Sequence, residues 1–277
     1  MEIGTLIFPT DYSIRMDELG VALEERGFES LWVPEHTHIP TSRLSPWPGG
    51  ADLPREYSHS FDPFVCLSFA AAVTKNLKLA TGICLLPQRD TITTAKSVAS
   101  LDEMSGGRFV FGVGAGWNRE ELEHHHPDFK GRFQRMEEQM QAMTALWSQD
   151  EAEFSGNHVN FSSSWQWPKP AQSPRPPIVL GGETDYTLQR IAKYADGWLP
   201  RARGGFDAAA EIARLQKAAD ENGRDMATLS VSVFGAAPKA DVLDSFREAG
   251  ITRAILPLPS NGRDETLVLL DQYAALL

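Results

Sequence analysis

An alternation of strand-like and helix-like segments is the feature that most constrains how this chain folds. Short apolar runs rich in β-branched residues recur eight times, and most are followed by a segment with helical periodicity. We expect strands at Ile3 to Phe8, Ser30 to Pro34, Leu77 to Leu86, Phe109 to Gly114, Ile178 to Gly181, Gly197 to Pro200, Leu229 to Phe234 and Ala254 to Pro257. The expected helices are Ser13 to Arg26, Asp62 to Lys75, Thr91 to Met104, Arg132 to Trp147, Thr184 to Tyr194, Ala208 to Asn222, Ala240 to Ala249 and Asp264 to Leu276.

The apolar character of the strands indicates a parallel sheet. Runs such as LKLATGICLL are apolar at nearly every position, as expected where helices cover both faces of a sheet. Eight such units without a break in composition predict an α/β fold, a single (β/α)8 TIM barrel over residues 1–277. An open doubly wound sheet is the structural alternative, because it shares the same alternation.

Three stretches are longer than a barrel requires. They are residues 36–61, 115–130 and 151–176. The first two follow strands, so we expect them to lie over the catalytic face. The third follows a helix and begins with EAEFSGNHVNF, which predicts a hairpin. Four tryptophans in these stretches either form an aromatic wall for a substrate or pack the loops together: Trp47, Trp117, Trp165 and Trp167.

The charge of the chain argues against some classes of binding partner, and its cysteines indicate the compartment. The chain has 26 basic and 37 acidic residues, a net charge of −11, and no basic cluster, so nucleic acid and anionic membranes are poor partners. Cys66 and Cys84 lie in apolar stretches without metal-ligand spacing, and we expect buried free thiols in a reducing cytoplasm. The first residues lack the features of a signal peptide, and no apolar run approaches the ~20 residues of a membrane span, so a cytoplasmic protein is expected.

Candidate site residues lie where strands end, because in a parallel barrel the following loops converge there. Glu35 and His36 end one strand, and a histidine there is suited to proton transfer near neutral pH. The FGVGAGW run has GxGxG spacing, not the GxGxxG of dinucleotide sites, and favours equally a close ligand approach or a tight strand exit. The consecutive histidines 124–126 lack the spacing of metal ligands, so no metal is expected.

A second group of strand ends suggests an anion site. Gly181 and Gly182 stand just before a predicted helix, whose free amides attract anions, and Arg201 and Arg203 follow the next strand. A plain turn explains the glycines almost as well.

The stretches LATGICLLPQRDTITTAKSVASLDEMSGGRFVFGVGAGW and PRPPIVLGGETDYTLQRIAKYADGWLPR, with the earlier WVPEH, carry a family resemblance. From Met1 to about Arg203 the chain resembles the luciferase-like oxidoreductases, which use flavin or F420, and most closely their F420-dependent members. The C-terminal quarter matches only in architecture. The resemblance implies a bacterial-luciferase-like barrel that holds F420, or alternatively FMN, in its mouth.

The resemblance also implies roles for individual residues. The planar ring would lie against a non-prolyl cis peptide at Gly82-Ile83. His36 would face the reactive part of the ring, with Glu35 at a position where an acidic residue is frequent. Trp117 replaces the catalytic glutamate of the sugar-phosphate dehydrogenase branch, which argues against a sugar phosphate substrate. The full set of expected cofactor contacts is Thr81, Gly82, Ile83, Gly114, Ala115, Gly116, Gly181, Gly182, Glu183 and Arg201.

Our leading interpretation is therefore an F420-dependent oxidoreductase that moves hydride between the cofactor and a small organic substrate, with His36 handling the proton. An FMN-dependent monooxygenase and a barrel that binds cofactor without catalysis are the alternatives. Members of the family are commonly dimeric, so a homodimer is expected.

Overall fold

The chain folds into a closed barrel of parallel strands, as seen in a computed structural model that describes residues 1–50 and 52–277. Ala51, in the first expected loop, lies outside the described residues. The barrel strands are β1 (Glu2–Leu6), β2 (Ser30–Val33), β3 (Lys78–Thr81), β5 (Phe109–Gly114), β8 (Ile178–Gly181), β9 (Gly197–Leu199), β10 (Ser230–Phe234) and β11 (Arg253–Pro257). Pairing of β3 with β5 and of β1 with β11 closes the sheet, which confirms the TIM barrel and excludes the open sheet.

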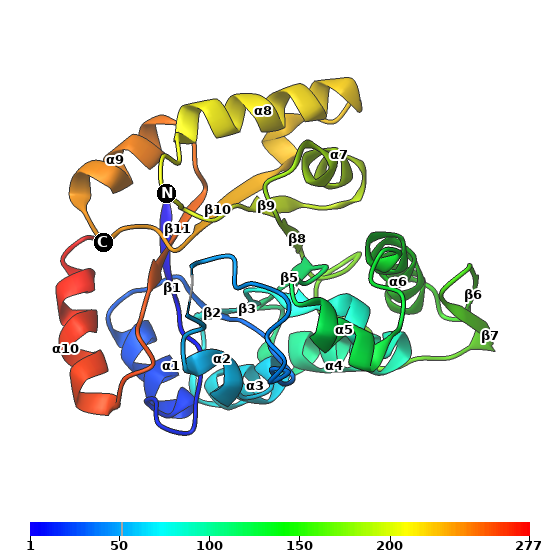
Figure 1. Ribbon diagram of the computed structural model, residues 1–277, viewed down its shortest axis with the longest axis horizontal. Coiled ribbons are helices and arrows are strands. Elements are labelled where there is room, and N and C mark those ends of the chain that lie inside the picture. Colours follow the sequence, from blue (N-terminus) through cyan, green and yellow to red (C-terminus); the bar gives the residue numbers. More distant parts are fainter. Residues whose placement is uncertain (51) are drawn as a thin grey trace.

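Helices form a ring around the strands (Figure 1). They are α1 (Met16–Glu25), α3 (Pro63–Val73), α4 (Thr91–Ser105), α6 (Arg132–Ser148), α7 (Asp185–Tyr194), α8 (Ala208–Glu221), α9 (Ala240–Glu248) and α10 (Arg263–Ala274). Each expected helix is present, with bounds within three residues of the prediction. Capping residues explain several of the starts: Asp62, Asp90, Thr184 and Asp207 each accept a hydrogen bond from a backbone amide in the first turn of their helix.

One expected strand is broken in two. The run Leu77 to Leu86 forms β3 and a short β4 (Cys84–Leu85), separated by a cis peptide between Gly82 and Ile83. Leu79 pairs with Phe109 and Cys84 with Val113, so five steps on one strand oppose four on the other. The extra residue makes a bulge in the sheet. A 3-10 turn, η1 (Leu86–Gln88), follows at once.

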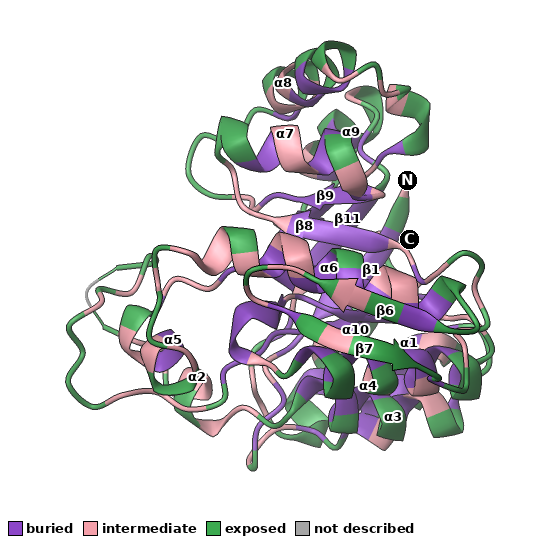
Figure 2. Cartoon of the chain, turned by 90° about the vertical axis from the view of Figure 1, so that its right-hand side faces the viewer, coloured by how far each residue is buried: buried purple, intermediate pink, exposed green. Residues whose placement is uncertain are grey.

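The barrel interior is packed below the mouth. Seven side chains fill it: Leu6, Trp32, Ala80, Val110, Val179, Leu199 and Ile255. Nearer the N-terminal ends of the strands, Arg253 donates to both carboxylate oxygens of Glu29, at 2.6 and 2.5 Å. Figure 2 shows the barrel strands β8, β9 and β11 as mostly buried. The free volume of the barrel therefore lies at the C-terminal ends of the strands.

Two of the three long insertions lie at the barrel mouth, and the third lies on the outside of the barrel. Residues 36–61 contain the short helix α2 (Glu56–His59), and residues 115–130, expected as a loop, contain α5 (Arg119–His125), begun by the cap of Asn118. Both helices lie on the mouth side, at the left of Figure 2. The hairpin of β6 (Ala152–Ser155) and β7 (Asn160–Ser164) is confirmed, but it packs against α6 on the outside. A second 3-10 turn, η2 (Met226–Thr228), precedes β10.

The cysteines and the length of the helices can also be compared with the sequence. Both cysteines are free and buried, as expected. Within residues 1–50 and 52–277, every helix is too short or too polar to cross a bilayer.

Candidate active site at the barrel mouth

A cavity of about 320 Å³ opens at the C-terminal ends of the strands. This volume lies at the lower end of the ~300 to 1,000 Å³ typical of ligand sites. Its walls are rich in aromatic side chains, namely Phe8, Trp47, Tyr57, Trp117, Phe133 and Phe234. Trp47 and Trp117 thus belong to the aromatic wall that the sequence suggested. Trp165 and Trp167 do not, because none of the described lining residues comes from 151–176.

The bulge between β3 and β4 forms part of the cavity floor, and the glycines of β5 make room for it. A Cβ at Gly112 would lie 1.8 Å from the main-chain oxygen of Thr81. A Cβ at Gly114 would lie 1.8 Å from Cδ1 of Ile83, whose side chain also rests 3.4 Å from the Cβ position of Gly181. The glycine spacing of β5 therefore serves the close approach of the protein's own bulge. Gly114 lines the cavity, but the Ile83 side chain covers its Cβ position.

Thr81 supports the bulge and does not contact the cavity. Its side chain is fully buried, and its hydroxyl donates to the main-chain oxygen of Gly112 at 2.7 Å. It is absent from the described residues that line the cavity. Its expected contact with a cofactor stays a prediction. The neighbouring Gly82 and Ile83 do line the cavity.

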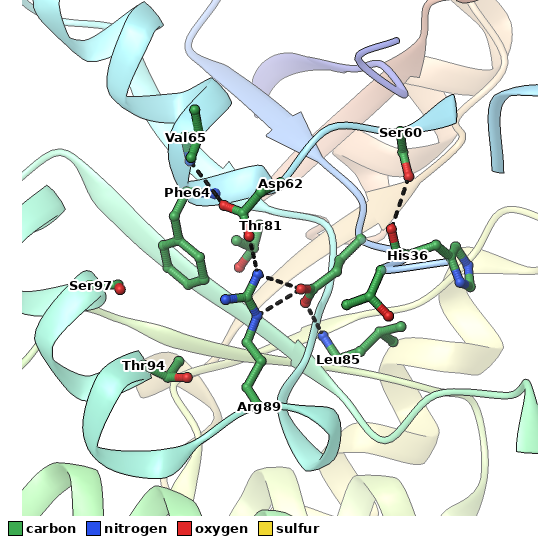
Figure 3. A network of polar contacts seen from close by, with 12 residues as sticks. His36, Ser60, Asp62, Phe64, Val65, Thr81, Leu85, Arg89, Thr94 and Ser97 are labelled. Carbon is green, nitrogen blue, oxygen red and sulfur yellow. Dashed lines mark hydrogen bonds and ion pairs between the residues drawn. The ribbon is translucent and has the colours of Figure 1, made fainter. Parts of the chain in front are cut away.

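Glu35 lines the cavity, and its carboxylate already accepts hydrogen bonds from Leu85 and Arg89, which are labelled in Figure 3. One oxygen accepts from the backbone amide of Leu85 in β4 at 2.7 Å, and the other accepts from Nε of Arg89 at 2.7 Å. Arg89 in turn donates to Asp62, the cap of α3, at 2.6 Å. Because the Glu35 side chain is only 2% exposed, these contacts favour a supporting role in which it anchors the bulge. Its expected catalytic role stays a prediction.

His36 points away from this ion pair, toward a second carboxylate that the sequence reading missed (Figure 3 shows the ring). Nδ1 of His36 lies 2.8 Å from Oε2 of Glu121, and both side chains are buried. Glu121 stands in the first turn of α5, where Asn118 accepts from its backbone amide at 3.2 Å. The local signal was the N-R-E-E sequence of a capped helix start, but only the fold brings it beside a histidine 85 positions away.

The pairing fixes how His36 presents its ring. An ionised carboxylate at Nδ1 keeps the proton on that nitrogen, so Nε2 is the atom left for other chemistry. Tyr57 and Trp117 pack against the ring with centroid distances of 5.0 and 5.8 Å. His36 lines the cavity, and none of the described residues hydrogen-bonds its Nε2. The mouth therefore holds an oriented histidine able to give or take a proton.

The opposite wall of the cavity is formed by the ends of β8 and β9. Gly182 has a φ of +118°, a conformation that suits glycine, and Thr184 caps α7. Arg201 donates to both oxygens of Glu183, each at 2.6 Å. Burial opposes ionisation of Glu183, but the charge and hydrogen bonds of Arg201 outweigh it and lower the pKa of that carboxyl.

This wall differs in one respect from the expected anion site. Gly181, Gly182, Glu183 and Arg201 all line the cavity, together with Ala115 and Gly116 of the neighbouring exit. However, Arg201 is neutralised by Glu183, and Arg203 donates to the main-chain oxygen of Pro48 at 2.8 Å. The predicted residues are brought together, with less free positive charge than the sequence suggested.

The surface histidines form a cluster next to the site. His38 stacks on His124 with centroids 5.0 Å apart, and His125 lies 5.6 Å from His38. In the part of the chain that the structure describes, no group of three or more His, Cys, Asp or Glu side chains has an arrangement suited to a metal ion.

Comparison with known proteins relates the whole chain to one family. The chain is 37% identical, over all of its length and 99% of the relative, to the uncharacterized protein Rv0953c of Mycobacterium tuberculosis. Two solved structures match with TM-scores of 0.79 over 100% of this chain and 98% of theirs. They are the coenzyme F420-dependent tetrahydromethanopterin reductase of Methanopyrus kandleri, 17% identical, and the monooxygenase RslO1 of Streptomyces bottropensis, 18% identical. Residues 11–255 match the model of the luciferase-like monooxygenases, and the chain therefore belongs to that family.

Proposed function

We propose that this protein is an F420-dependent oxidoreductase that moves hydride between the deazaflavin and a small organic substrate with a carbonyl group or an activated double bond. One observation carries the proposal. A buried carboxylate, Glu121, orients His36 at the cavity wall with Nε2 left free of protein partners. Hydride transfer to such a substrate requires one proton per turnover, and this histidine is placed to supply it.

The residues at the mouth fit a flat ring with a polar tail. Ile83 and Leu85 give the bulge an apolar surface, and Phe234 and the aromatic residues of the loops enclose the space above it. At the other wall, Gly182 and the start of α7 present backbone amides where a phosphate is favoured. We assign the ring to the bulge and the phosphate to this wall. When bound, F420 supplies or accepts the hydride, and the protein provides orientation and proton transfer.

The proton step belongs to His36. Reduction of a carbonyl places negative charge on its oxygen, and protonated Nε2 of His36 neutralises that charge by donating a proton. In the reverse direction neutral Nε2 accepts the proton of an alcohol. Glu121 stabilises the positive charge that His36 carries in one half of the cycle, as a carboxylate partner does for other catalytic histidines.

Other residues of the site act by positioning and by excluding water. Glu35 and Arg89 fix the backbone at Leu85, and Thr81 fixes β5 to β3 beneath the bulge. Tyr57 and Trp117 cover the ring of His36, which reduces the access of bulk water. The same aromatic lining favours a mostly apolar substrate over a sugar phosphate.

Titration with each cofactor tests the proposal. Purified protein is titrated separately with F420 and FMN while the fluorescence of each ring is followed, and the F420-loaded protein is then tested with a panel of ketones, aldehydes and enones. We expect F420 to bind and at least one acceptor to be reduced. The His36→Asn variant is expected to keep binding and to lose about a hundredfold in turnover, the lower end of what a positioned acid contributes.

The controls separate the alternatives. His158→Asn changes a histidine outside the cavity and should leave turnover unchanged. Tight FMN binding with oxygen consumption and no F420 binding would replace the proposal with an FMN-dependent monooxygenase. Cofactor binding without turnover on the full panel would favour a barrel that has lost catalysis. We also propose a cytoplasmic homodimer, and sedimentation equilibrium measures its stoichiometry.

A further inference from the structure

Two arginines beside the barrel mouth have no acidic partner. Arg132 begins α6 and Arg190 lies in α7. Arg132 donates to the main-chain oxygen of Phe129 at 3.0 Å, and Arg190 donates to that of Tyr186 at 3.4 Å. Among residues 1–50 and 52–277, no carboxylate forms an ion pair with either guanidinium. In a chain with 37 acidic and 26 basic residues, positive charge is therefore left without a counter-charge at this place.

Phe133 connects the two arginines to the cavity. Cζ of Arg132 lies 4.5 Å from the centroid of the Phe133 ring, and Cζ of Arg190 lies 4.6 Å from it. Such stacking uses the flat face of a guanidinium and leaves its N–H edge able to donate hydrogen bonds. Phe133 itself lines the cavity. Both cations therefore stand behind one residue of the cavity wall.

The charges of the two arginines repel each other. Burial lowers the pKa of Arg132, and the charge of Arg190 lowers it further. Nε of Arg132 is buried and has no hydrogen-bond partner among the described residues. Both side chains are nevertheless partly exposed, so a group from solvent can reach their outer N–H groups. Because partly buried like charges are stabilised by a counter-charge between them, the pair favours an anion at this edge.

The arginine pair lies next to the wall to which we assign the phosphate of the cofactor. Thr187 of α7 lines the cavity at that wall, and Arg190 follows three residues later, where two side chains share one face of a helix. Phe133 lines the cavity from α6, the preceding helix of the outer ring (Figure 1). A chain of atoms that runs outward between α6 and α7 from a phosphate at this wall would therefore reach the arginines.

We propose that Arg132 and Arg190 form a carboxylate-binding site at the rim of the mouth, and that it takes the acidic tail of F420. Beyond its phosphate this cofactor carries a lactyl group and γ-linked glutamates, so the tail is a row of carboxylates. A guanidinium binds a carboxylate through paired N–H groups. The assignment to F420 rests on the proposed function, whereas the carboxylate site does not. FMN ends at its phosphate and has no such tail.

The length of the tail tests the assignment. The Kd of F420 without glutamates and of F420 with three glutamates is measured by ring fluorescence for wild type, Arg132→Met and Arg190→Met. We expect the glutamates to tighten binding roughly tenfold in wild type, the scale of one charge-assisted hydrogen bond. In each arginine variant this gain should fall below about threefold, because one of the two cations is lost.

Two controls accompany this measurement. The Kd of the form without glutamates should be the same in all these variants, which shows that the fold and the ring site are intact. Arg224→Met also removes one positive charge, but Arg224 lies at the other end of the barrel, where it donates to the main-chain oxygen of Ala195. This variant should retain the full gain from the glutamates.

A fragment of the tail tests the site without the cofactor. γ-Triglutamate is titrated into protein labelled with ¹⁵N-arginine, and the Nε–H signal of Arg132 is assigned by its loss in Arg132→Met. We expect this signal to shift in wild type and in Arg224→Met. In Arg190→Met it should stay in place at the concentration that saturates wild type.

The outcomes separate the site from its ligand. No shift with γ-triglutamate in wild type would overturn the carboxylate site. A shift together with equal Kd values for the two forms of F420 would assign the site to the carboxylate of a substrate and overturn the assignment to the tail. If neither form of F420 binds, the proposed function and the assignment to its tail both fail, whereas the titration with γ-triglutamate still decides the carboxylate site.

Discussion

The contact between Gly114 and Ile83 allows a quantitative test of how the bulge is accommodated. A Cβ added to Gly114 would lie 1.8 Å from Cδ1 of Ile83, 3.2 Å from its Cγ1 and 3.9 Å from its Cβ. Ordinary carbon contacts are at ~3.5 to 4.0 Å, so Cδ1 is the atom in severe conflict. Removing Cδ1 by Ile83→Val leaves a nearest contact at 3.2 Å, which a shift of a few tenths of an ångström relieves.

The effects of Gly114→Ala and Ile83→Val on the free energy of unfolding should therefore not be additive. Gly114→Ala alone overpacks the floor and should lower the free energy of unfolding by ~2 kcal/mol, within the range of such changes. Ile83→Val alone removes one methyl group and should cost ~1 kcal/mol. In the double variant the added methyl occupies the space left by Cδ1, so the loss should stay near ~1 kcal/mol, a favourable coupling of ~2 kcal/mol.

Urea unfolding followed by tryptophan fluorescence measures the four free energies at equal protein concentration. Gly112→Ala is the matched control, because its Cβ would lie 1.8 Å from a main-chain oxygen, that of Thr81. No side-chain truncation can relieve that clash, so Gly112→Ala should remain destabilising in the Ile83→Val background. Additive losses for Gly114→Ala and Ile83→Val would refute the idea that Ile83 occupies the space above Gly114.

Three further predictions concern charge and burial. Arg89→Met should lower the free energy of unfolding by ~3 to 5 kcal/mol in urea melts, because it leaves the buried carboxylate of Glu35 without its cation. Burial opposes ionisation of Glu29, but its arginine partner outweighs that effect and holds its pKa at about 2, below the ordinary 4.5. A lowered pKa stabilises the fold above pH 4.5 and loses that contribution as pH falls toward 2, so wild type should lose ~3 kcal/mol more over this window than Glu29→Gln. Burial raises the pKa of Cys66 to about 12 and that of Cys84 well above its ordinary value, so neither thiol should react with a disulfide reagent at pH 8 before unfolding.

Each of these three predictions has its own control or its own outcome that would contradict it. Arg119→Met removes an exposed pair on α5 and should change stability by less than ~0.5 kcal/mol. A loss for Arg89→Met as small as for Arg119→Met would show that Glu35 is stabilised without its cation. Parallel acid profiles of wild type and Glu29→Gln would contradict the lowered pKa of Glu29. Titration of one thiol equivalent in folded protein would show that a cysteine is accessible.

The periodic part of the structure could be predicted because it depends on local pattern. Apolar runs and helical segments identified every barrel strand and each outer helix, since each element must bury one face to be stable. Strand ends likewise led to His36, Gly181 and Arg201, because parallel strands bring their C-terminal ends to one face. The helix α5 was missed inside an expected loop, because its seven residues are too few to show a period.

Only the tertiary structure decided which residues that are distant in the sequence contact one another. The chain by itself determined the barrel, the family resemblance and the residues at the mouth. It did not determine that Glu121 meets His36, that Arg201 is neutralised by Glu183, or that the β5 glycines make room for the bulge at Ile83. Hydrophobic periodicity is a property of neighbouring residues, whereas these contacts join segments up to 85 positions apart and arise only when the barrel closes.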